Sequence, residues 1–135
     1  MLTDHLNKIK IDNFFNMYNE YKKVWLAFVQ IEAQENYSFN DLIDSENADT
    51  PQYAGAWANV LVKADNINTV LEILPQGLDE KNFKVIFIDK IENVASLIEY
   101  EELDKNVIKE VDWLLSTDYV FKISDKIFPY VESIG

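Results

Sequence analysis

The sequence predicts a single α+β domain spanning residues 1–135, and three observations support that fold class. Apolar residues recur at helical spacing in three separate segments, which is the pattern of helices with one buried face. Short runs rich in β-branched and aromatic residues separate them, which is typical of strands. Only three glycines and three prolines occur, and no repeat or flexible linker divides the chain. We therefore expect a sandwich of about four mostly antiparallel strands, loosely like the ferredoxin-like plan, with two helices on one face and an N-terminal helix.

The N-terminal helix is expected over residues 4–21, capped by Thr3 or Asp4. Its apolar side chains follow the i, i+3, i+4, i+7 rule and are Ile11, Phe14, Phe15, Tyr18 and Tyr21. The next run, residues 24–31, is almost unbroken in its apolar character, which favours a strand buried on both sides. A continuation of the helix is the alternative, because Trp25, Phe28 and Val29 keep the same helical face.

A βαβ unit is expected in the middle of the chain. Residues 56–64 form its first strand, Asp65 and Asn66 are capping candidates, and a helix follows to Leu74. The run Pro75-Gln76-Gly77 is expected to stop that helix, and residues 83–88 form the second strand. Because the crossover of such a unit is right-handed, its helix covers one defined face of the sheet.

The C-terminal third contains one further helix and one further strand. Residues 92–103 look acidic and irregular, and Asp104 is a candidate N-cap for a helix that ends at Ser116-Thr117-Asp118. Its inward side chains are expected to be Val107, Ile108, Val111, Leu114 and Leu115. Residues 119–123 read as the last strand, which residues 127–131 either extend or cover.

The charge of the chain limits the kinds of partner. It carries 24 acidic and 12 basic residues, a net charge of −12, and all twelve basic residues are lysine, with no arginine. Such a surface repels nucleic acids and anionic membranes, whose binding requires Lys and Arg. It attracts a basic protein partner, although the same charge also serves solubility alone.

Motifs for catalysis and for cofactor or metal binding are sparse. There is no cysteine, the single histidine His5 stands near the N-terminus, and the three glycines are too scattered for a phosphate-binding loop. The acids of residues 41–49 do not follow the order of a calcium-binding loop. With 24 acids, carboxylate pairs arise by chance and carry no specificity. We therefore expect no enzyme activity, no cofactor and no metal.

A long acidic connection between the first two strands is the candidate binding site. Long loops of this kind are usually functional or disordered. Its aromatic side chains are expected to anchor a partner while its carboxylates steer a cationic surface toward them. These residues are Tyr37, Phe39, Asp41, Asp44, Glu46, Asp49 and Tyr53. Alternatively, Phe39, Leu42 and Ile43 merely tuck the loop onto the core. A second acidic cluster, residues 92–104, is either part of the same patch or a solvated face.

The expectation for function is a non-enzymatic acidic protein-binding module. The chain resembles bacterial immunity proteins and antitoxins, which occlude a basic partner such as a nuclease toxin, in size, charge and compactness only. No secretion signal or membrane span is evident, so a cytoplasmic monomer or homodimer is expected. The alternative is a small ligand- or metal-binding regulatory domain of ferredoxin-like type.

Overall fold

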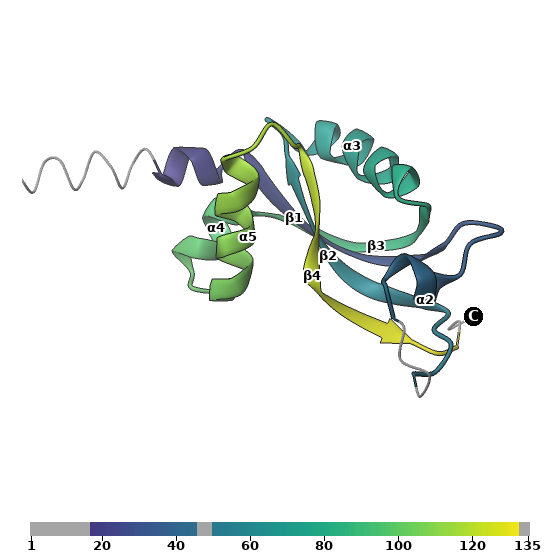
Figure 1. Cartoon of the computed structure of the whole chain (residues 1–135). Helices are drawn as coiled ribbons and strands as arrows, with labels where there is room; N and C mark the ends of the chain where they lie inside the picture. Colours follow the sequence, from purple (N-terminus) through teal and green to yellow (C-terminus); the bar gives the residue numbers. More distant parts are fainter. Residues whose placement is uncertain (1–16, 46–49, 133–135) are drawn as a thin grey trace, which may run out of the picture.

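A computed structural model describes residues 17–45 and 50–132 of the chain. They form an α+β fold around one four-stranded sheet of order β3-β1-β2-β4 (Figure 1). The strands are β1 (Val24–Ala33), β2 (Gly55–Lys63), β3 (Phe83–Asn93) and β4 (Phe121–Tyr130), and every neighbouring pair is antiparallel. The prediction of four mostly antiparallel strands is therefore confirmed. Residues 24–31 belong to a strand, so their helical alternative is wrong.

The register of β1 and β2 separates the sheet into two faces. Ala27 pairs with Val60 and Leu26 pairs with Leu61, so successive residues point to opposite sides. We call face A the side that carries Ala27 and Val60, and face B the side that carries Leu26 and Leu61. Both β2 and β3 run antiparallel to β1, which lies between them. They are therefore parallel to each other, and with the intervening helix they form the expected βαβ unit, with one strand inserted.

Helix α3 (Ile67–Glu80) covers face A. The Asn66 side chain caps its start by accepting a hydrogen bond from the Thr69 amide at 3.0 Å. Its buried stripe is Val70, Leu74 and Leu78. The prediction that Pro75-Gln76-Gly77 ends the helix is wrong. Burial of Leu78, one turn beyond Leu74, favours continuation of the helix, and the Pro75 ring lies on the exposed side.

Two further helices, α4 (Val94–Glu99) and α5 (Lys105–Leu115), pack on face B at one end of the sheet. Their apolar residues form a core cluster with Val24 and Leu61. Because Leu61 and Val62 point to opposite faces, α3 and the α4–α5 pair lie on opposite sides of the sheet, as Figure 1 shows. The expectation of two helices on one face is therefore wrong.

Three further predictions concern this helical pair. Residues 94–99, expected to be irregular, form α4, because Asn93 caps it and its Val94, Ala95 and Leu97 side chains are buried. Asp104 caps α5 as predicted, accepting a hydrogen bond from the Asn106 amide at 2.8 Å. The helix ends at Ser116, also as predicted.

Of the predicted N-terminal helix, the structure describes residues 17–21, which are helical. There Tyr21 is buried in the face B cluster and its hydroxyl donates a hydrogen bond to Asp112 of α5 at 2.8 Å. The predicted cap at Thr3 or Asp4, the apolar residues Ile11, Phe14 and Phe15, and His5 all lie outside the described residues.

Strand β4 forms one edge of the sheet and includes Pro129, which an edge strand tolerates. It contains a bulge, in which Ser124–Lys126 oppose the single β2 residue Asn59. The predicted strand at residues 119–123 is thus the start of a longer strand, and residues 127–130 extend it.

Candidate functional site

The acidic connection between β1 and β2 is partly packed against the core. It contains the short helix α2 (Phe39–Leu42), capped by Ser38. Phe39 is only 3% exposed and packs against Phe83, with ring centroids 5.6 Å apart. Leu42, Ile43 and Tyr53 pack against the same core cluster. The alternative prediction, that Phe39, Leu42 and Ile43 tuck the loop onto the core, is confirmed, and the Phe39 ring is not presented at the surface.

Asn40 fixes this connection to the following segment. Its side-chain amide donates to the Pro51 carbonyl at 3.0 Å, and its side-chain oxygen accepts from the Tyr53 amide at 2.8 Å. Two hydrogen bonds from one buried side chain give the loop a defined path.

The remaining predicted site residues are only partly gathered together. Tyr37 is 49% exposed, and Asp41 and Asp44 are exposed, so three of the predicted side chains do face solvent. Tyr53 is half-buried. Glu46 and Asp49 lie outside the described residues. Whether this loop binds a partner stays a prediction.

The sheet itself presents a second surface, which the sequence did not reveal. Helices α4 and α5 cover only the end of face B around Val24 and Leu61. Over the other half of face B, one aromatic side chain from each strand reaches the surface. We call these four residues the aromatic face: Phe28, Trp57, Phe87 and Phe128.

The rings of the aromatic face contact one another across all four strands. Phe28 stacks on Trp57 with centroids 5.3 Å apart and planes inclined by 13°. Phe128 meets Phe28 edge-on at 6.3 Å, and Phe87 meets Trp57 edge-on at 6.3 Å. The two outer rings, Phe87 and Phe128, are 54% and 47% exposed. The result is a continuous aromatic surface with its geometry set by the strand register.

A polar group closes the far end of this surface. Gln30 donates a hydrogen bond to the Tyr130 hydroxyl at 2.8 Å, and that hydroxyl donates to Glu32 at 3.1 Å. Burial raises the pKa of the Tyr130 hydroxyl above its ordinary value, which already keeps it protonated and able to donate at neutral pH. Tyr130 lies over Gly55, where a Cβ atom would come within 2.6 Å of the Tyr130 oxygen. Glycine is therefore required for this arrangement.

A cleft of about 430 Å³ opens between the aromatic face and the helices; we call it the helix cleft. Phe28 and Phe128 contribute to its wall, so it is continuous with the aromatic face. Leu26, Leu97 and Val107 contribute apolar lining to it. Its charged lining consists of Asp89, Lys90, Glu92, Glu102, Asp104 and Lys126.

The charges of the helix cleft do not balance. Lys90 pairs with Glu92 at 3.3 Å and Lys126 pairs with Asp104 at 3.4 Å. The Asn106 amide, which donates to Asp104, lowers the pKa of that carboxyl, and the Lys126 ammonium lowers it further. Within the described part of the chain, Asp89 and Glu102 form no ion pair. The cleft therefore keeps two uncompensated carboxylates, both exposed.

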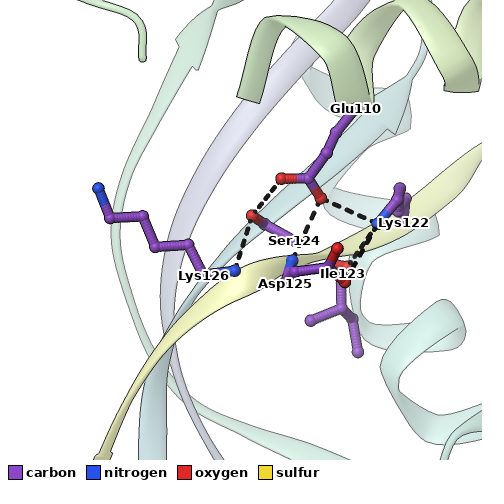
Figure 2. Close-up of polar contacts among 6 residues, drawn as sticks. All are labelled: Glu110, Lys122, Ile123, Ser124, Asp125 and Lys126. Atoms are coloured by element: carbon purple, nitrogen blue, oxygen red, sulfur yellow. Dashed lines mark hydrogen bonds and ion pairs between the residues drawn. The ribbon is translucent and has the colours of Figure 1, made fainter. Parts of the chain in front are cut away.

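A polar clamp holds α5 against the bulge of β4, next to the cleft (Figure 2). Glu110 accepts hydrogen bonds from the Ser124 hydroxyl at 2.7 Å, from the Lys122 ammonium at 2.9 Å and from the Asp125 amide at 3.2 Å. The Ser124 oxygen in turn accepts from the Lys126 amide at 3.1 Å. The clamp accepts hydrogen bonds from the backbone amides that the bulge leaves unpaired, and it thereby stabilises the cleft wall.

Among residues 17–45 and 50–132, no group of three histidines or carboxylates is placed to hold a metal ion. No helix in the same ranges is long and apolar enough to cross a membrane. Compared with protein-family models, curated proteins and solved structures, the chain matches none.

Proposed function

We propose that this protein is a non-enzymatic acidic module that binds a basic protein partner, as immunity proteins and antitoxins do. One observation carries the proposal: half of face B presents four mutually packed aromatic rings, of which Phe87 and Phe128 are about half exposed. Exposed contiguous apolar surface of this kind marks interaction sites in soluble proteins. Aromatic side chains are also the anchors most enriched at the energetic centres of protein interfaces.

The charge of the protein supports a basic partner. A net charge of −12 creates a field that attracts cationic proteins and accelerates their encounter. Asp41 and Asp44 of the acidic connection are exposed and contribute to that field without having to touch the partner. In this proposal the loop steers, and the aromatic face makes the contact.

The proposal is tested by selecting peptides from a random display library on the immobilised protein. We expect enrichment of peptides that combine apolar residues with lysine or arginine. Their affinity should fall at least tenfold for the double variant Phe87→Ser/Phe128→Ser, in which two exposed rings are removed without opening the core.

Tyr119→Ser is the matched control, because Tyr119 is a 65% exposed aromatic residue that precedes the other end of β4. This variant should bind the selected peptides as the unmodified protein does. Selection of neutral or acidic peptides would contradict the proposal, and so would equal binding to the double variant.

The second candidate is a ligand- or metal-binding regulatory domain of ferredoxin-like type. The βαβ unit formed by β2, α3 and β3, with β1 inserted, is the feature that favours it. The central pairing of consecutive strands β1 and β2, and helices on both faces, argue for a different plan. A rise in melting temperature on addition of calcium would support this second candidate.

A further inference from the structure

We infer that the partner of the aromatic face inserts an arginine or lysine side chain into the helix cleft. This inference rests on the proposed function and specifies how the same surface distinguishes its partner. The occupant is a protein segment whose apolar residues lie on the aromatic face and whose neighbouring cation enters the cleft.

The construction of the helix cleft suits a long cationic side chain. Leu26, Leu97 and Val107 provide apolar lining for the methylene stem of lysine or arginine. Phe28 and Phe128 belong to both the cleft wall and the aromatic face, so a cation in the cleft can lie over a ring. The side chain would thus be held along its whole length.

The charge balance decides the sign of the group that the cleft accepts. Lys90 and Lys126 are already neutralised by Glu92 and Asp104. Asp89 and Glu102 remain; both line the cleft and are exposed, so their carboxylates are accessible to an incoming cation. An anion would be repelled there, and a neutral group would leave the two carboxylates without a counter-charge.

The same charges argue against a second copy of this chain as the occupant. Face-to-face pairing of two copies would bring together two cleft rims of the same sign on two molecules of charge −12 each. Like charges placed opposite one another in an interface are strongly unfavourable.

The experiment uses the full chain and a synthetic amphipathic helical peptide, with leucines on one face and arginines along its borders. An analogue with citrulline in place of arginine keeps the shape and part of the N–H donors, but it replaces one nitrogen by a carbonyl oxygen and removes the charge. Binding is followed by NMR through the indole N–H signals of the three tryptophans. Trp57 lies in the aromatic face, whereas the Trp25 indole is hydrogen-bonded to the Ala64 carbonyl and Trp113 stacks on Tyr119.

We expect the arginine peptide to shift the Trp57 signal while leaving the Trp113 signal unchanged. Its dissociation constant should rise about tenfold for the citrulline analogue, and by a similar factor for the variant Asp89→Asn/Glu102→Gln. For that variant the two peptides should bind alike. Asp118→Asn is the control: it removes an exposed carboxylate of the α5–β4 connection and should leave the preference for arginine intact.

Three results would overturn the inference. In the first, both peptides shift the Trp57 signal equally and only Phe87→Ser/Phe128→Ser abolishes binding. The cleft then does not select a cation, although the aromatic face remains the proposed contact surface. If neither peptide shifts Trp57, both the inference and the proposed contact surface fail. If Trp57 shifts with protein concentration in the absence of peptide, the occupant is a second copy.

Discussion

Replacing Glu110 by glutamine is expected to destabilise the fold far more than its place on a helix surface suggests. The Glu110 and Lys122 side chains are only 13% and 20% exposed, and their charged atoms lie 2.9 Å apart. Glutamine keeps an oxygen for the Ser124 hydroxyl but loses the charge that faces Lys122 and the Asp125 amide. The largely buried ammonium is then left without its main counter-charge.

The expected loss is about 2–3 kcal/mol of unfolding free energy. Breaking a buried ion pair by removing one partner costs about 3–5 kcal/mol. The residual solvent exposure and the retained Ser124 hydrogen bond lower that figure here. Glu92→Gln is the matched control, because Glu92 pairs with Lys90 at a similar distance of 3.3 Å but with side chains 35% and 60% exposed. An exposed pair of this kind contributes below about 1 kcal/mol.

Urea denaturation of both variants measures these costs, with the midpoint shifting at constant slope. Lys122→Met and the double variant complete a cycle that isolates the energy shared by Glu110 and Lys122. The difference between the two glutamine variants should persist at high salt, since a buried pair is screened less than an exposed one. The reasoning is refuted if Glu110→Gln costs no more than Glu92→Gln, or if the cycle shows no coupling.

Two further predictions concern α3 and the helix before β1. A Cβ atom at Gly77 would lie 2.6 Å from the Phe121 ring, so Gly77→Ala should destabilise the protein by about 1 kcal/mol, because overpacking outweighs the better helix propensity. In a Phe121→Ala background the same change should instead stabilise by up to about 1 kcal/mol; stabilisation in both backgrounds would contradict the contact. Burial, and the hydrogen bond to Asp112, raise the pKa of Tyr21 from 10.0 to about 12, so the folded state favours the neutral hydroxyl. That stability is complete below pH 10 and is lost as the pH rises to about 12. Because the hydroxyl is only partly removed from water, we expect a loss about 1–2 kcal/mol larger than in Tyr21→Phe. Parallel losses of the two proteins in urea midpoints across this pH range would argue against it.

Most helices and strands are predictable from local sequence patterns, because capping and hydrophobic periodicity depend on residues that are close along the chain. The Asp104 cap and the strand at residues 83–88 follow directly from capping chemistry and β-branched composition. The predicted end of α3 is wrong because tertiary packing outweighs local helix propensity. Pro75 and Gly77 are poor helix formers, but Leu78 lies on the same buried stripe as Leu74 and its burial keeps the helix intact.

The candidate site was not predictable in the same way. Phe28, Trp57, Phe87 and Phe128 come from four strands, and only the register brings them onto one half of face B. A shift of one residue in any strand would send its ring to the opposite face. The sequence pattern therefore favours the acidic connection, where aromatic residues and acids are close along the chain. In the structure, Phe39 of that connection is a core residue.

Charge and aromatic surface have separate roles in the proposed interaction. The charge of −12 acts over a distance of about 8 Å at physiological salt, and it changes how often a partner arrives rather than how long it stays. The residence time of the partner depends on the apolar area removed from water and on cations bound in clefts. In the described part of the chain, the aromatic face and the helix cleft supply both and are continuous through Phe28 and Phe128. In this proposal, a partner that binds this surface carries its cation beside an apolar patch. A protein that is basic but lacks such a patch would associate fast and also dissociate fast.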